Sequence, residues 1–280
     1  MNSPKLLQLS GFGPAALLQH RGIKVSHDLP LVGRGLQDHL VVSYQFNANV
    51  PTLNNILGNK LGQYKAGLKY LLTRRGPLAV PVNQVGGFVK SNEKITAPDI
   101  QLYCNPMSYS LSSTGAAVPD KMPGYQLSAQ PCRATSTGVI EITSNDIHEA
   151  PNIMPCSLST AEDKAAVISA GRTLQRYANA NCLRELTTEA HTPDLLNLDD
   201  AALLEDFQNR ASTIYHASCT CRMGRTPHDS VLDARLRVHG VNGLRVADAS
   251  SFPNITSGNT NAPTMMLAMK AADLILEDAK

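Results

Sequence analysis

Three polar side chains in the last third of the chain have the chemical types needed to oxidise an alcohol. His216 precedes a Cys-Arg-Met-Gly segment, Asp248 closes a short apolar run, and Asn261 precedes an apolar stretch. A hydride leaves a carbinol carbon more easily while a base removes the hydroxyl proton, and imidazole titrates near neutral pH. An amide can donate a hydrogen bond to the developing alkoxide. We therefore interpret His216 as the candidate base and Asn261 as a second group on the substrate oxygen.

Structural roles compete with this interpretation. A histidine before small residues is often structural, and asparagine also favours a helix N-cap, a role that we keep open for Asn261. The spacing His216-x-x-Cys219-x-Cys221 could suggest zinc, but a closed site needs a fourth ligand, for which only the distant His228 is a candidate. We expect no metal site, and we expect the six scattered cysteines to be reduced thiols.

Both ends of the chain resemble one family. Residues 215–264 resemble the C-terminal signature of the glucose–methanol–choline (GMC) oxidoreductases, flavoenzymes that oxidise alcohols. Residues 3–14 resemble the second signature of that family, and residues 28–39 resemble its "DLPGVGxNLQDH" stretch. The departures from these patterns remove no chemical group; they are Phe12, Leu31 and Gly35.

The resemblance implies an FAD-dependent oxidoreductase that acts on the CH–OH group of an alcohol. It places His216 and Asn261 in catalysis. The N-terminus of the helix that follows Asn261 would direct its partial positive charge toward the reduced flavin, which is negatively charged. The residues that the resemblance places at the cofactor are Asp248, Ala249, Asn259, Asn261, Pro263 and Thr264.

Family members begin with a strand, a Gly-x-Gly-x-x-Gly turn and a helix that hold the adenosine half of FAD. No such segment precedes the second signature in this sequence. We therefore expect a truncated chain that lacks the adenine-binding half and is inactive alone, with a separate chain as one source of that half. The main alternative is a non-catalytic remnant or a partner subunit of a split flavoenzyme.

The segment from Gly11 to Ala16 imitates a dinucleotide-binding turn. It fits Gly-x-Gly-x-x-Ala, residues 6–10 could form the preceding strand, and residues 15–20 could open a helix. Asp28 would then stand near the position of a ribose-binding acid. A nicotinamide dehydrogenase is therefore a third hypothesis. A plain strand-to-helix turn, with Pro14 at the first helical position, explains the same segment more simply.

The sequence predicts an α/β flavin-domain remnant with an inserted α+β substrate domain built on an antiparallel sheet. Residues 1–40 and 211–280 would form the flavin-binding part, which holds the catalytic residues. Residues 41–210 would form the substrate-binding domain. Alternating apolar and polar residues within that middle segment are typical of a sheet with one face buried.

Hydrophobic periodicity and capping residues predict the individual elements. Expected strands cover 41–46, 99–104, 125–129 and 138–143, with a buried strand over 243–248. Expected helices cover 61–75 and 265–276, the latter buried throughout, and two more begin at Thr160 and at Asp199 or Asp200. Leu61, Tyr64, Leu68 and Leu71 or Leu72 should share one face of the first helix. The others should bury Val167, Ala170, Leu174 and Tyr177, and Leu203, Leu204 and Phe207.

Gln84 is the residue from which we infer a preference for the type of substrate. It precedes a Gly-Gly-Phe segment where choline-oxidising relatives tend to carry a glutamate, so the resemblance implies that it lines the substrate pocket. A neutral amide attracts a quaternary ammonium less than a carboxylate does, which favours uncharged alcohols over choline. The electrons would pass to a quinone or to oxygen.

Composition bears on nucleic-acid binding and on the cellular location of the protein. The net charge of +2 comes from 25 basic and 23 acidic residues and gives no electrostatic footprint for nucleic acid. No apolar stretch reaches the ~18 residues of a membrane span. We expect a cytoplasmic protein, with peripheral attachment to a membrane as the alternative.

Overall fold

The computed structural model describes residues 1–81, 83–112, 116–191 and 193–279, which fold into two compact units. The first unit comprises residues 1–39, 132–164 and 213–280, and the second comprises 40–131 and 165–212. Two of the boundaries lie within three residues of the expected ones. Residues 132–164 differ from the expectation, because they belong to the first unit and not to the inserted domain.

The first unit is built from short elements around one apolar core, to which Leu7, Val32, Leu232 and Leu267 contribute. β1 and β2 form a parallel pair, and β3, β10 and β11 form a three-stranded antiparallel sheet. The elements are α1 (Asn2–Leu9), β1 (Phe12–Gly13), α2 (Ala15–His20), β2 (His27–Asp28), β3 (Arg34–Leu36), β10 (Gly138–Glu141), β11 (Asn152–Met154), η3 (Ala249–Ser251) and α8 (Asn261–Asp278).

Gln8 of α1 explains why residues 132–164 join this unit. Its side chain is completely buried, donates to the carbonyl oxygen of Ile140 at 3.0 Å, and accepts from the amide of Ile142 at 2.9 Å. A buried amide needs such partners. The strand predicted over 138–143 is present as β10, but it pairs with β3 and not with the large sheet.

The structure rules out a dinucleotide-binding turn at Gly11. Residues 6–9 belong to helix α1, so the leading strand that this motif requires is absent. Asp28 accepts a hydrogen bond from the amide of Ala15 at 3.0 Å, which satisfies the start of α2. The Asp28 carboxylate thus lies at the N-terminus of α2, where the phosphate of a dinucleotide would have to bind. The helix predicted over 15–20 is confirmed, but Pro14 is its N-cap and not its first helical residue.

Two further expectations for the first unit were wrong. Residues 243–248 form no strand and make only one isolated bridge, between Arg237 and Arg245. Helix α8 is not buried throughout, because only one side of a helix can face a core. Its buried residues are Leu267, Ala271 and Leu274.

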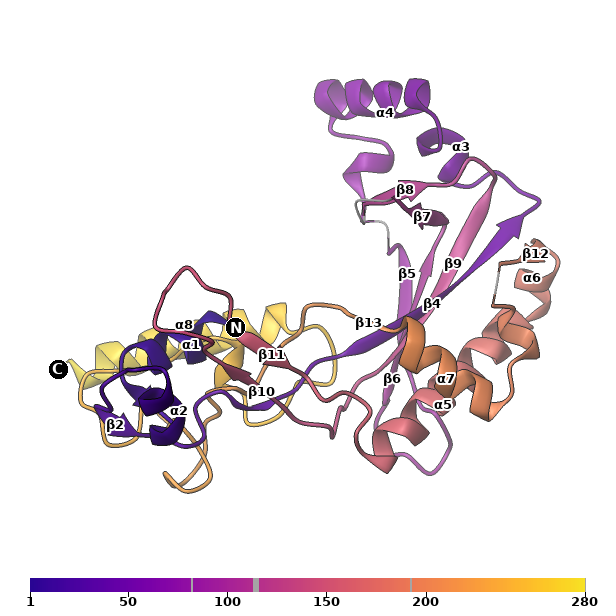
Figure 1. Ribbon diagram of the computed structural model, residues 1–280. Coiled ribbons are helices and arrows are strands. Elements are labelled where there is room, and N and C mark those ends of the chain that lie inside the picture. The colour runs from indigo at the N-terminus through magenta and orange to yellow at the C-terminus, as the bar shows by residue number, and fades with distance from the viewer. Residues whose placement is uncertain (82, 113–115, 192, 280) are drawn as a thin grey trace. The chain divides into compact units, whose positions relative to one another are not determined.

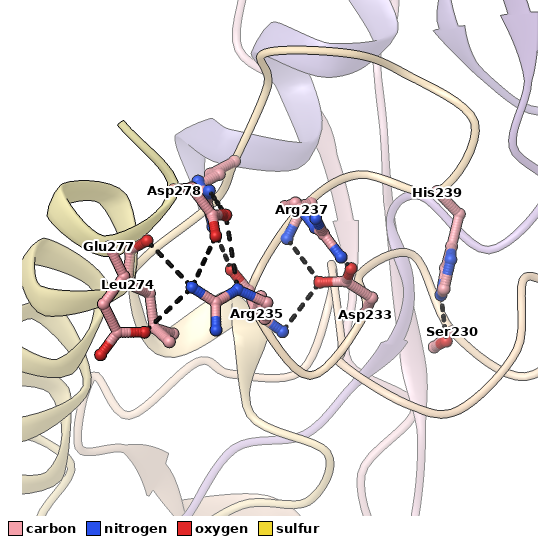
Figure 2. Close-up of polar contacts among 9 residues, drawn as sticks. Ser230, Asp233, Arg235, Arg237, His239, Leu274, Glu277 and Asp278 are labelled. Atoms are coloured by element: carbon pink, nitrogen blue, oxygen red, sulfur yellow. Dashed lines mark hydrogen bonds and ion pairs between the residues drawn. The ribbon is translucent and has the colours of Figure 1, made fainter. Parts of the chain in front are cut away.

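The C-terminal end of α8 is fixed by an arginine. Figure 2 shows Arg235 donating to the carbonyl oxygen of Leu274 at 3.2 Å and to the carboxylates of Glu277 at 3.1 Å and Asp278 at 2.6 Å. A cation at this position also compensates the negative end of the helix dipole. Helix α8 is about 27 Å long at 1.5 Å per residue. The bonds of Arg235 fix its C-terminal end within the first unit.

The second unit contains a sheet with the path β12-β4-β9-β6-β5, in which neighbouring strands are antiparallel (Figure 1). The strands predicted near 41–46, 99–104 and 125–129 are confirmed as β4, β6 and β9. The strands are β4 (Leu40–Ala48), β5 (Val85–Val89), β6 (Ile100–Asn105), β7 (Tyr109–Leu111), β8 (Ala117–Pro119), β9 (Gly124–Pro131), β12 (Thr187–Ala190) and β13 (Ser212–Thr213).

One face of this sheet is apolar, and Tyr44 connects it to α7 by donating to Asp206 at 2.6 Å. The helices of the second unit are α3 (Asn54–Leu57), α4 (Lys60–Thr73), η1 (Pro77–Ala79), α6 (Asn181–Arg184), η2 (Leu195–Asn197) and α7 (Asp200–Arg210). Helix α5 (Ala161–Ala178) begins in the first unit and continues in the second.

The helix predictions for these segments hold in part. The hydroxyl of Thr160 accepts from the amide of Asp163 at 3.2 Å at the start of α5, and Asp199 caps α7 by accepting from Ala202 at 2.9 Å. Tyr177 is 45% exposed, so it does not belong to the buried stripe of α5. Leu204 of α7 is half-buried, whereas Leu203 and Phe207 are buried as predicted. The predicted face of α4 exists, and it is exposed.

Candidate active site

His216 lies on a loop of the first unit whose backbone is held in unusual conformations. Tyr215 has φ 64° and Cys219 has φ 73°, both in the left-handed region that non-glycine residues rarely adopt. The His216 amide donates to the carboxylate of Asp38 at 3.0 Å, and this same carboxylate accepts from the hydroxyl of Thr213. Such strain often accompanies a functional constraint, because surrounding contacts must enforce it.

His39 fixes the proton on the imidazole of His216. Nε2 of His39 lies 2.9 Å from the carbonyl oxygen of Cys132, which can only accept, so this nitrogen carries the hydrogen. In the neutral ring Nδ1 of His39 is then an acceptor, and it lies 2.9 Å from Nδ1 of His216. His216 must therefore donate from Nδ1. In this tautomer Nε2 carries the lone pair that can accept a proton.

The surroundings keep both imidazoles neutral near neutral pH. Burial lowers the pKa of His39, which is 1% exposed. Burial also lowers the pKa of His216, the charge of His39 lowers it further, and the Asp38 carboxylate opposes these effects. A neutral ring is the form that can act as a base.

The amide beside His216 belongs to Asn259 and not to Asn261. Nδ2 of Asn259 lies 3.4 Å from Nε2 of His216. Asn261 is exposed and is the first residue of α8, whose N-cap is Thr260, so the N-cap role considered for Asn261 is wrong. The two asparagines stand two residues apart, and only the turn before α8 determines which one reaches the histidine.

Both carboxylate oxygens of Asp248 accept hydrogen bonds, one from its own turn and one from α1. One carboxylate oxygen accepts from the amide of Ser250 at 2.7 Å and from its hydroxyl at 2.5 Å, and the other accepts from the hydroxyl of Ser3. These bonds cap the short helix η3, and the carbonyl of Ala249 accepts from the amide of Cys219 at 3.2 Å. The carbonyl oxygens of Asp248 and Ala249 also accept from the amides of Ser251 at 2.9 Å and Phe252 at 3.3 Å.

The string from Gln37 to His39 was not identified as part of the site from the sequence, although it lies within the second matching segment. Gln37 donates to the carbonyl oxygen of Ala134 at 2.8 Å and accepts from the amide of Ile255 at 2.9 Å and the thiol of Cys219 at 3.3 Å. Gln37, Asp38 and His39 thus position the loop that carries His216 and Cys219, which we call the histidine loop. The Gln-Asp-His string itself was the signal that could have revealed them.

The cysteines near His216 are packing groups. Burial raises the pKa of both Cys219 and Cys221 to about 12, so both thiols stay protonated. Within the residues that the structure describes, no three His, Cys, Asp or Glu side chains form a metal-binding group.

Gln84 belongs to the second unit, where it is exposed directly before β5. A mainly apolar cavity of about 340 Å³ lies in the same unit, between the sheet and α5. Val85, Leu102, Cys104, Leu127 and Leu174 contribute to its lining. Burial raises the pKa of the Cys104 thiol, so the cavity offers apolar surface and no activated nucleophile.

Comparisons with known proteins agree on one family. Residues 134–268 match the family model described as GMC oxidoreductase. An oxygen-dependent choline dehydrogenase from Photobacterium profundum is 37% identical over 278 residues, covering 99% of this chain and 48% of the relative. An alcohol dehydrogenase (acceptor) from Pseudomonas putida is 36% identical over 277 residues, covering 99% and 50%. The chain spans about half the length of the curated relatives it matches.

Solved structures have the same fold. A pyridoxine 4-oxidase from Mesorbium loti matches all of this chain and 50% of its own with a TM-score of 0.81 and 25% identity. A formate oxidase variant from Aspergillus oryzae RIB40 matches 98% of this chain and 52% of its own with a TM-score of 0.87 and 22% identity. Residues 134–268 therefore match the C-terminal domain of the GMC oxidoreductases, a family of FAD-dependent flavoproteins.

Proposed function

We propose that this chain provides the proton acceptor for an FAD-dependent oxidation of alcohol CH–OH groups. The observation that carries the proposal is the contact between Nδ1 of His39 and Nδ1 of His216 at 2.9 Å, which leaves Nε2 of His216 as a lone-pair acceptor. This nitrogen takes the hydroxyl proton. The neighbouring amide of Asn259 donates to the oxygen as negative charge develops on it. The carboxylate of Asp38 then stabilises the imidazolium that results.

The start of α8 fits an electron-rich cofactor edge. The side chain of Thr260, the N-cap residue, accepts no hydrogen bond from the first amides of this helix. Pro263 at the third position has no amide hydrogen to satisfy. We infer that the backbone of Asn261 and Ala262, with the half-buried Thr264, holds the flavin ring. FAD, when bound, supplies the hydride acceptor.

Substitution of His216 tests the proposal. In the protein completed with its adenine-binding half and loaded with FAD, His216→Asn and His216→Ala should each lower kcat/KM for a primary alcohol by about 100-fold or more, the scale of a positioned base. His228→Ala, at an exposed histidine, is the control and should have no effect. The FAD absorbance and the thermal midpoint must stay unchanged in all variants. Alcohol turnover at the unsubstituted rate in either His216 variant would refute the assignment.

A further inference from the structure

Helix α4 presents an apolar face that no described part of its own unit covers. Five large apolar side chains recur every three or four residues, so they share one side of the helix. They are Leu61 at 64% exposed, Tyr64 at 74%, Leu68 at 59%, Leu71 at 68% and Leu72 at 75%.

The opposite side of α4 is the one that meets its own unit. Ala66 is the buried residue of the helix, and Tyr70 beside it is half-buried. At about 100° per residue, these two positions lie across the helix axis from Leu68 and Leu72. The principal neighbours of α4 are α3 and η1, which leave it at one end of the second unit (Figure 1). The apolar face therefore points away from the unit that carries it.

The charge around this face has one sign. Residues 51–90 contain six lysines and arginines and no aspartate or glutamate, although the whole chain is almost balanced at 25 basic and 23 acidic residues. By helical periodicity Lys60 and Lys65 stand at the two edges of the apolar face, and Lys69 follows Lys65. Long lysine stems can lie along an apolar surface while their ammonium groups reach outward to anions.

The helix is preformed for such a contact. Asn59 caps its start by accepting from the amide of Gly62 at 2.8 Å. At its end, Arg74 takes the left-handed conformation with φ 55° and places its guanidinium 5.2 Å from the ring centre of Tyr70. Binding therefore does not have to order this segment.

We propose that α4 docks this face onto the surface of a bilayer that contains anionic lipids. Apolar side chains flanked by lysines are the pattern of a helix that lies in the plane of the headgroups. With 14 residues, α4 is about 21 Å long, too short to span the hydrocarbon core. No helix among the described residues is long and apolar enough to cross a membrane. An acidic groove on another protein would complement the same charges, but the lysines at both edges suit a flat anionic surface better.

This inference goes beyond the proposed function and does not depend on it. A bilayer would bring the second unit to the phase in which apolar alcohols and quinones dissolve. The vesicle binding that tests it needs neither turnover nor FAD, so it can be measured equally in the His216→Ala variant.

Co-sedimentation of the full chain with vesicles tests the proposal. Vesicles of phosphatidylcholine with phosphatidylglycerol should bind the chain, and phosphatidylcholine alone should bind it at least about tenfold more weakly, since basic residues contribute through anionic headgroups. The double variant Leu68→Gln/Leu72→Gln should lose binding about tenfold or more. Leu276→Gln, at a leucine of α8 that is 65% exposed, is the matched control and should bind normally. Far-UV circular dichroism verifies that each variant is folded.

A second variant separates the electrostatic from the apolar contribution to vesicle binding. Lys65→Gln/Lys69→Gln should weaken binding to the anionic vesicles and reduce its dependence on salt. The proposal is overturned if the chain does not bind anionic vesicles, or if the Leu68/Leu72 variant binds as well as the Leu276 control. It is also overturned if sedimentation shows self-association, or complex formation with an acidic protein, that needs Leu68 and Leu72 while vesicles bind nothing.

Discussion

The imidazole of His216 obtains its chemistry from its neighbours and not from its sequence position. Nδ1 is committed to His39, whose own Nε2 is committed to a carbonyl oxygen, so the proton-accepting nitrogen is determined. This arrangement differs from a histidine–carboxylate pair, because the carboxylate of Asp38 bonds the backbone of His216 and not its ring. Asp38 acts on the ring only through its charge.

The pH dependence of the reaction should report this environment. Because burial lowers the pKa of His216, the neutral base persists below pH 6.5, and the acid limb of kcat/KM is expected there. Asp38→Asn keeps an acceptor for the amide of His216 but removes the charge that raises this pKa. The acid limb should therefore move to still lower pH, and the plateau of kcat/KM should fall because the imidazolium loses the stabilising charge of Asp38. A limb that moves to higher pH would contradict this electrostatic assignment.

At the scale of elements, different contacts fix helices α8 and α4: hydrogen bonds from Arg235 hold the C-terminal end of α8, and close packing at Gly62 holds the start of α4. Arg235 binds the C-terminal end of α8, and the N-terminal end of the same helix follows Asn259. The position of α4 depends on Gly62, because a Cβ there would lie 1.8 Å from the carbonyl oxygen of Ile56. A side chain at this position cannot be accommodated without separating α4 from the segment before it.

Two glycines of α4 provide a matched pair for measuring this contact. Gly62→Ala should destabilise the packing of α4 by about 1–3 kcal/mol through overpacking. Gly67→Ala, where a Cβ would meet nothing within 4 Å, should stabilise the helix by about 0.5–1 kcal/mol. Hydrogen exchange of amides 63–73 measures both effects. Faster exchange in the Gly67 variant, or no change in the Gly62 variant, would show that α4 packs differently.

At the scale of the whole molecule, the candidate base and the candidate selector of the substrate belong to different units. His216 lies in the first unit and Gln84 in the second. The relatives include choline and alcohol dehydrogenases, so the family does not decide between a charged and an uncharged substrate. We propose that the neutral side chain of Gln84 favours an uncharged alcohol.

Substitution of Gln84 would test this preference. In the protein completed with its adenine-binding half and loaded with FAD, Gln84→Glu should improve choline relative to an uncharged primary alcohol by about 1–2 kcal/mol, because a carboxylate attracts a quaternary ammonium. The effect should appear in KM, since the ammonium has the same charge in the ground and transition states. The neighbouring Asn83→Asp provides a control for charge alone. An unchanged ratio of the two substrates would remove Gln84 from the pocket.

The sequence by itself indicated the GMC family and predicted three strands of the second unit, β4, β6 and β9, and it is the basis on which His216 is proposed as the base. Alternating apolar and polar residues predict β4, β6 and β9. The expectation that only one face is buried was wrong, because the polar side chains of Gln101, Gln126 and Gln130 are buried as well. Local capping chemistry likewise predicts the starts of α5 and α7. The histidine loop was identified from motifs whose residues are close together in the chain.

Only the tertiary structure decided which residues surround His216 and which apolar faces are covered. His39 lies 177 positions before His216, so no local pattern could connect the two rings. The choice of Asn259 over Asn261 depends on the turn before α8, and the return of residues 132–164 to the first unit depends on the buried amide of Gln8. The exposed apolar face of α4 has the same periodicity as a buried one. Periodicity shows that a helix has two sides, but burial depends on what the rest of the chain places against each side.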